Sequence, residues 1–199
     1  MNSNLNKTGI SPDPALSFVF AAFAIITWIS VIFPLTPDAM VTAGILQVSL
    51  GAAAYTGGHL NLKLGNPHGN VNLILAVILG FAAGFAHILG VGAHLMHWTF
   101  HPWILSVILM IGGLYLLCFA PLMIHGPAYL LIAHLCVCSG FILGGLGDLL
   151  SVKTLSLISA WLLLIFAILT LYQGVSEMFE QMGHHLPQGG PLVKSKSAK

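Results

Sequence analysis

The sequence predicts an all-α integral membrane protein, a bundle of six transmembrane helices. Only 6% of the 199 residues are charged, 57% are hydrophobic and the mean hydropathy is +0.96, whereas a soluble domain carries about a quarter charged residues. The chain contains no arginine, and residues 64–147 include no Asp, Glu, Lys or Arg. Because one span needs roughly 20 apolar residues, this uncharged run must hold several spans.

The first three spans are expected at 15–33, 39–57 and 71–89. The first follows a polar stretch with two prolines and ends at the proline-rich break 34–38. The polar stretch 59–70 separates the second span from the third. Alternation of apolar and polar residues is absent, so we expect helices and not the strands of a membrane barrel.

The last three spans are expected at 103–124, 128–149 and 155–171. A His-Pro pair precedes the fourth span, a His-Gly-Pro sequence at 125–127 ends it, and the polar break 151–153 separates the last two. Six helices with short loops account for most of the chain. The predicted organisation is an N-terminal segment 1–14, a transmembrane domain 15–174 and a tail 175–199.

The distribution of lysine predicts the orientation. With six spans both termini lie on one side, and that side holds five lysines, against Lys153 alone on the other. The positive-inside rule therefore predicts cytoplasmic termini in a multi-pass protein of the cell membrane. No cleavable signal peptide is expected, because the first 14 residues are polar and contain two prolines. The tail from Gln181 onward is expected to be disordered.

Glycines recur at the spacing of close helix packing. Gly80 and Gly84 form one GxxxG pair, Gly140 and Gly144 form another, and the second span carries further glycines two turns apart. Such spacing lets helix backbones approach closely in lipid. The pattern leaves open whether these contacts form within one protomer or between protomers.

One histidine falls inside an expected span. His134 is an ionisable group at membrane depth, and a reference pKa of about 6.5 suits proton-linked transport. The alternative is a neutral histidine hydrogen-bonded to a neighbouring helix. Gln47 and Ser49 in the second span raise the same choice and favour structural bonding. His87, in the third span, could pair with His134 as haem ligands.

Other residues give weaker signals. His94, His97 and His101 have the spacing of metal ligands, but a solvated cluster in a loop explains them as well, and His184 and His185 lie in the tail.

No catalytic motif, nucleotide-binding loop or paired carboxylate site is present, so an enzyme is not expected. A net charge of +1 removes the case for nucleic-acid binding. We interpret the three cysteines as small core residues; they are Cys118, Cys136 and Cys138.

Four features, taken together and in order, resemble a known transporter family. Ser11-Pro12-Asp13-Pro14-Ala15-Leu16 precedes the first span, and Trp161 lies in the last. The second span and the loop after it contain Gly44, Gly51, Gly57, Gly58, Lys63, Gly65, Asn66 and Gly69. The chain closes with Tyr172, Glu177, Glu180, Gly183, Leu186 and Pro187. This series is similar to the acetate uptake transporter family, to which the bacterial acetate/succinate permease belongs. The family's aromatic-rich start of the third helix is absent here.

The resemblance implies a channel or secondary transporter for acetate and related short-chain carboxylates, including succinate, with proton symport. It also implies six-helix protomers in a cyclic homo-oligomer, a hexamer, and no cofactor. A hydrophobic ring that restricts the family's pathway maps onto Phe20, Ala76 and Val137. The family-motif positions are Pro12, Pro14, Gly44, Gly51, Gly65, Asn66 and Glu177.

Two functions of other classes remain as alternatives. One is a membrane haem or metal electron carrier that uses the buried histidines. The other is a non-transporting subunit of a larger membrane complex.

Overall fold

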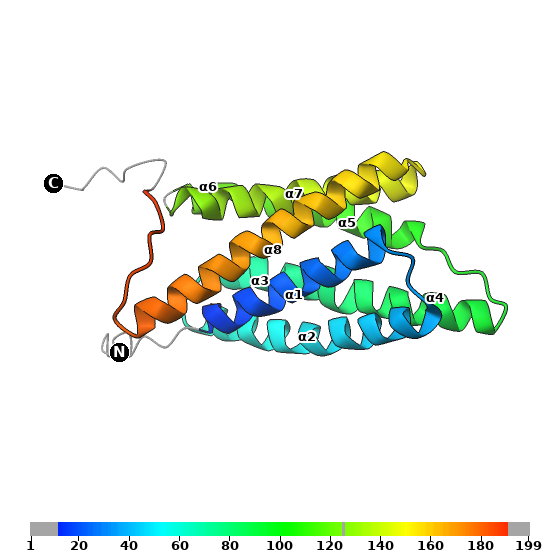
Figure 1. Ribbon diagram of the computed structural model, residues 1–199, viewed down its shortest axis with the longest axis horizontal. Coiled ribbons are helices and arrows are strands. Elements are labelled where there is room, and N and C mark those ends of the chain that lie inside the picture. The colour runs from blue at the N-terminus through cyan, green and yellow to red at the C-terminus, as the bar shows by residue number, and fades with distance from the viewer. Residues whose placement is uncertain (1–11, 125, 191–199) are drawn as a thin grey trace.

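The computed structural model describes residues 12–124 and 126–190, in which the chain forms a bundle of helical rods that lie side by side (Figure 1). Five helical stretches are long and apolar enough to cross a membrane, and α5 is a shorter apolar helix of 15 residues. The predicted all-α bundle is confirmed. In chain order the elements are α1 (Asp13–Ile32), α2 (Pro37–Lys63), α3 (His68–Leu75), the π-helix η2 (Ala76–Ala82), α4 (Ala83–Leu95), α5 (Trp103–Leu117), α6 (Ala120–Met123), α7 (Ala128–Leu149) and α8 (Lys153–Gln181).

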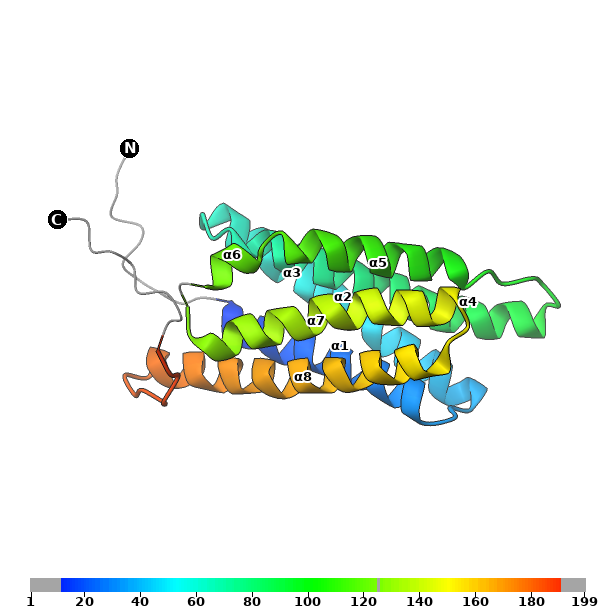
Figure 2. The same ribbon diagram turned by 90° about the horizontal axis from the view of Figure 1, so that it is seen from above.

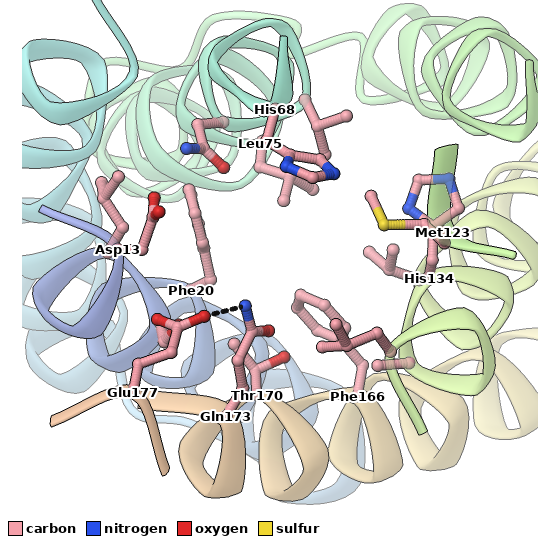
Figure 3. Close-up of a pocket in the computed structure, with 17 residues that line it drawn as sticks. Asp13, Phe20, His68, Leu75, Met123, His134, Phe166, Thr170, Gln173 and Glu177 are labelled. Carbon is pink, nitrogen blue, oxygen red and sulfur yellow. Dashed lines mark hydrogen bonds between the residues drawn. The ribbon is translucent and has the colours of Figure 1, made fainter. Parts of the chain in front are cut away.

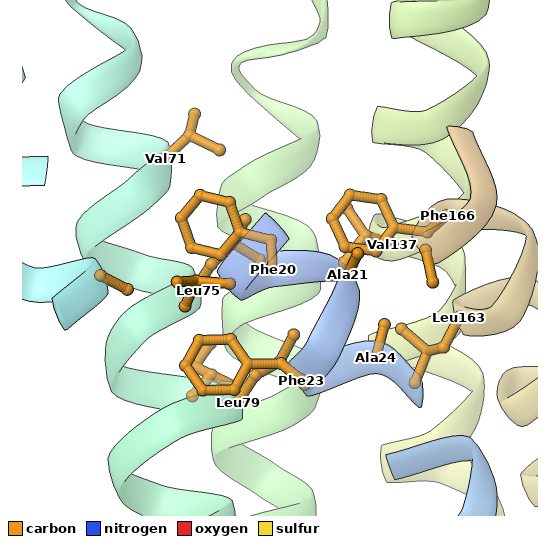
Figure 4. Close-up of a cluster of buried hydrophobic side chains, with 14 of the residues drawn as sticks. Phe20, Ala21, Phe23, Ala24, Val71, Leu75, Leu79, Val137, Leu163 and Phe166 are labelled. Atoms are coloured by element: carbon orange, nitrogen blue, oxygen red, sulfur yellow. The ribbon is translucent and has the colours of Figure 1, made fainter. Parts of the chain in front are cut away.

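The rods pack in two groups that α1 joins. Helix α2 packs against the rod made of α3, η2 and α4, which we call the third rod. Helix α7 packs against both α5 and α8. Helix α1 contacts α2 on one side and α8 on the other. Buried aromatic and aliphatic side chains from α1, the third rod, α7 and α8 fill the middle of the bundle, among them Phe20, Phe23, Leu79 and Phe166 (Figure 4).

The described chain starts and ends at the same end of the bundle. Helix α1 begins there and α8 ends there (Figures 1 and 2), and we name this the terminal end. Lys63 lies at the terminal end, and Lys153 lies at the opposite end. This arrangement is the one expected for an even number of crossings.

The fourth span is broken, whereas the sequence predicted one continuous span at 103–124. Helix α5 ends at Leu117, and the short α6 begins at Ala120. Pro121 explains the break, because a proline ring clashes with the carbonyl of the residue four positions earlier, which is Leu117. The last turn of α5 tightens, because the Cys118 and Phe119 N–H groups donate to the Tyr115 and Leu116 carbonyls.

The last helix is longer than predicted. Helix α8 continues through the predicted domain boundary at residue 174 and ends at Gln181. Gly183, with a φ of 82°, then closes the helix, and the His184 N–H donates to the Phe179 carbonyl at 2.9 Å. This is the Schellman arrangement, in which a left-handed residue lets the chain turn back.

The prediction of disorder from Gln181 onward is wrong for residues 182–190. This segment returns along α8, where the Tyr172 hydroxyl donates to the Pro187 carbonyl. The Gln188 amide donates to Ser176 at 2.7 Å and to Glu180 at 2.8 Å. The Pro187 carbonyl and the Gln188 side chain therefore fasten the segment to α8. The rest of the tail lies outside the described residues.

The glycine pairs bring α2 against the third rod within one chain. A Cβ atom on Gly84 would lie 2.7 Å from the Gly44 carbonyl oxygen, and one on Gly51 would lie 3.2 Å from the Gly80 Cα. Gly80 belongs to the π-helical stretch, a local widening of the helix that was not predicted. On α7, Gly140 and Gly144 face Ser159 of α8. The described contacts thus assign both GxxxG pairs to packing inside a protomer.

Candidate substrate pathway

A cavity of about 190 Å³ lies at the terminal end of the bundle, between α1, α3, α7 and α8 (Figure 3). Its mouth is polar, with Asp13 and Glu177 at the start of α1 and near the end of α8. Its inner part is apolar, and the side chains that line it there are Phe20, Leu75, Val137 and Phe166. The cavity therefore leads from a polar entrance to the hydrophobic middle of the bundle.

The carboxylates at the mouth are held by amides. Asp13 accepts a hydrogen bond of 2.6 Å from the Asn61 amide, and Glu177 Oε1 accepts one of 2.8 Å from Gln173. Glu177 Oε2 and His68 Nε2 are buried and have no hydrogen-bond partner within the described chain. Among the described residues no lysine lines the cavity. The entrance thus carries two acidic side chains, each of which accepts a hydrogen bond from an amide.

One helix face supplies much of the lining from α8. Phe166, Thr170, Gln173 and Glu177 follow one another at intervals of three or four residues, which places them on one side of a helix. Sequence reasoning selected only Glu177 from this stripe. The signal was present, because polar residues at helical spacing in an apolar span indicate an inward-facing surface.

His134 projects from α7 into the cavity wall and is only 4% exposed. Its Nε2 donates to the Leu116 carbonyl of α5 at 2.8 Å. Leu116 lies in the last turn of α5, and its carbonyl also accepts from the Phe119 N–H at 2.9 Å, so the histidine uses the second lone pair of this oxygen. The expected bond to a neighbouring helix is therefore present, and the same ring also faces the cavity.

The predicted constriction is brought together only in part. Phe20 and Val137 both line the inner cavity and are 5% and 1% exposed. Ala76 is fully buried, but it does not line the cavity; its neighbour Leu75 does. A shift of one residue turns a helical position by about 100°, so an ungapped alignment selects the wrong face easily. Leu75 and Phe166 are the lining residues that the alignment missed.

Most family-motif positions form helix ends and helix contacts. Pro12 precedes α1 and Pro14 lies in its first turn. Gly65, with a φ of 78°, ends α2, and the Asn66 side chain accepts from the His68 N–H at 3.1 Å to start α3. Of these positions only Glu177 lines the cavity. The motifs therefore shape the terminal end, and they place Asp13 and His68 at its mouth.

The remaining histidines that the structure describes do not gather into a metal site. Within residues 12–124 and 126–190, no group of three or more His, Cys, Asp or Glu residues could hold a metal ion. His94, His97 and His101 are all exposed. His87 pairs with Gln47 at 2.8 Å, and Gln47 also donates to Thr27 at 3.5 Å, whereas His134 bonds Leu116. The two buried histidines thus have different partners, and Gln47 has the structural role expected of it.

Fold and site together define a polytopic helical membrane protein with a small, partly polar cavity that opens at one end of the bundle. In fold the chain is similar to a solved protein, the bacterial acetate channel SatP. The TM-score is 0.72 with 21% identity, over 92% of this chain and 100% of the other. No family model and no curated protein matches the chain. The similarity covers the whole bundle and agrees with the family resemblance drawn from the sequence motifs.

Proposed function

We propose that this protein is a membrane channel or secondary transporter for acetate and related short-chain carboxylates. The observation that carries the proposal is the cavity of about 190 Å³, with a polar mouth and an apolar inner end, inside a bundle that has the fold of an acetate channel. Drug-sized ligands occupy roughly 300–1,000 Å³, so this volume suits a ligand of a few heavy atoms. Its place at the end of the bundle suits the entrance of a pathway along the helices.

The proposal includes proton linkage, a cell-membrane location and a homo-oligomer. His134 and the acidic mouth support proton linkage, because ionisable groups on a transport pathway are where protons are exchanged. The small-residue helices and the many apolar side chains exposed on the bundle support an oligomer in lipid, a hexamer by the family resemblance. A single species of monomer mass in mild detergent would count against the oligomer.

The test of the proposed function is uptake of labelled acetate into proteoliposomes. We expect uptake above that of protein-free vesicles, with competition from formate, lactate and succinate measured in the same assay. Uptake no faster than in protein-free vesicles would refute the proposal. The absorbance spectrum of the purified protein tests the alternative of an electron carrier, which the separate partners of His87 and His134 do not favour.

A further inference from the structure

We infer that a groove at the end of the bundle opposite the terminal end binds the headgroup of an amine-bearing phospholipid, with Asp148 holding the ammonium group and Lys153 the phosphate. The inference concerns the membrane around the protein and does not depend on the proposed function.

The groove has a volume of about 530 Å³ and lies where α5 begins, α7 ends and α8 begins. Figures 1 and 2 both place the start of α5 beside the turn from α7 to α8. The groove is separate from the cavity at the terminal end, because the two share no lining residue. Helix ends lie at the depth where a span leaves the hydrocarbon for the headgroup layer. A bilayer therefore presents phospholipid headgroups to this groove.

Two opposite charges line the groove without pairing with each other. Asp148 lies in the last turn of α7, and Lys153 is the first residue of α8. Within the described part of the chain no ion pair joins them, and the Asp148 carboxylate instead accepts from the Ser156 hydroxyl at 3.1 Å. The whole chain has only six lysines and five acidic residues, so two of them in one groove are a concentration of charge. A ligand that carries a cation and an anion side by side would satisfy both.

Two further serine hydroxyls line the same groove. Ser106 of α5 is only 2% exposed, and its hydroxyl has one long hydrogen bond, of 3.5 Å, to the Pro102 carbonyl. Ser151, whose φ of 56° turns the chain between α7 and α8, supplies the other hydroxyl. Hydroxyl groups donate to phosphate oxygens. The groove thus offers a phosphate one cation and neutral donors.

The surroundings of the groove are apolar, which favours a lipid over a soluble zwitterion. Trp103 lines the groove and is exposed, as is its neighbour Ile104. Leu150 and Val152, on either side of Ser151, are exposed as well. Tryptophan is enriched at the depth of the headgroups, and exposed aliphatic side chains beside it can contact acyl chains. A soluble molecule would gain nothing from these contacts.

The acidic side chain selects the class of headgroup. The primary ammonium of phosphatidylethanolamine can donate hydrogen bonds to the Asp148 carboxylate. The choline group of phosphatidylcholine carries the same charge but has no N–H to donate. Phosphatidylglycerol has no cation, so its phosphate would meet the carboxylate without compensation. Phosphatidylethanolamine is therefore the headgroup that fits both ends of the groove.

The first arm of the experiment uses the unaltered protein in mild detergent, titrated with each of the three lipids. Native mass spectrometry measures the apparent dissociation constant of the first bound lipid. We expect phosphatidylethanolamine to bind about 3- to 10-fold more tightly than either other lipid, as for the gain of one hydrogen bond. Glycerophosphoethanolamine, the same headgroup without acyl chains, tests a soluble zwitterion. We expect that a large excess of it displaces no lipid.

The second arm uses variants. Asp148→Asn removes the charge but keeps an acceptor for the Ser156 hydroxyl, and it should bring the affinities for phosphatidylethanolamine and phosphatidylglycerol together. Lys153→Gln should weaken the binding of all three lipids. Asp38→Asn is the matched control, because Asp38 lies in the first turn of α2 at the same end of the bundle and does not line the groove. Melting temperature and elution profile monitor folding, and the first arm decides the question if Asp148→Asn does not fold.

Several outcomes would overturn the inference. Equal affinities for phosphatidylethanolamine and phosphatidylglycerol in the unaltered protein would do so, and so would an unchanged preference in Asp148→Asn. Equal losses of preference in Asp38→Asn and Asp148→Asn would overturn the assignment to this groove. Displacement of the lipid by glycerophosphoethanolamine would make the occupant a soluble zwitterion and not a lipid. None of these measurements involves acetate, so the proposed function is tested separately.

Discussion

Gly80 lies so close to Gly51 that a Cβ atom on Gly80 would be 2.6 Å from the Gly51 Cα and 3.0 Å from the ring of Phe23. The contact joins the π-helical stretch of the third rod to α2. Because lipid is as apolar as the helix surfaces, this close backbone approach is the kind of contact that holds membrane helices together.

The first prediction follows from that contact. Gly80→Ala should lower the melting temperature in detergent, with a cost of roughly 1–3 kcal/mol, because backbone atoms must move to admit the methyl group. Gly92→Ala is the matched control in the same rod, since a Cβ atom there meets nothing within 4 Å. That variant should be neutral or slightly stabilising. Equal melting temperatures for the two variants would contradict the packing described here.

Phe20 is predicted to restrict the pathway. Phe20→Ala should widen the inner cavity and admit larger monocarboxylates, seen as faster uptake of butyrate relative to acetate in proteoliposomes. Phe23→Ala is the control, because Phe23 is fully buried one helical turn away and does not line the cavity. That change should cost about 3–5 kcal/mol of stability without altering the uptake ratio. The same uptake ratio in wild type and Phe20→Ala would remove Phe20 from the pathway.

The family's missing aromatic residue gives a third prediction. The alignment places it at Ala76, whereas the structure has Leu75 on the cavity wall. Leu75→Tyr should therefore narrow the cavity and slow uptake of larger acids. Ala76→Tyr should instead overpack a fully buried position and lower the yield of folded protein. Should Ala76→Tyr fold normally and slow uptake while Leu75→Tyr does not, the alignment would be right and the assignment to Leu75 wrong.

Gly183 is predicted to fix the return of the chain along α8. Its φ of 82° is unfavourable for other residues, so Gly183→Ala should destabilise the turn by about 1–2 kcal/mol. We expect faster hydrogen exchange in residues 184–188, with the melting temperature of the bundle little changed. Gly190→Ala is the control, because no positive φ is found there. Unchanged exchange in Gly183→Ala would show that the side-chain bonds of Tyr172 and Gln188 suffice.

The orientation gives a fifth prediction. A protease-cleavable tag after Lys199 should resist protease added to right-side-out vesicles, because the lysine distribution predicts that both termini are cytoplasmic. Detergent permeabilisation should then allow cleavage. Cleavage in intact vesicles would reverse the orientation and would place the cavity mouth on the outer side of the membrane.

The sequence alone determined the class of protein and the order of its parts. Long uncharged runs must be helices in lipid, because every backbone group there has to be satisfied within its own segment. Prolines located one of the turns for a similarly local reason, as the break between α1 and α2 shows. Pro121 also carried the information for the break in the fourth span, but the apolar residues around it concealed that break.

Only the tertiary structure decided which way each helix faces. In spans that are apolar on every side, hydropathy contains no rotational signal, so sequence could not choose between Leu75 and Ala76 or pair Gly80 with Gly51. The partner of His134 was hidden for the same reason, because the Leu116 carbonyl belongs to another helix. Contacts between segments far apart in the chain fix these rotations, and the cavity forms where the resulting faces meet.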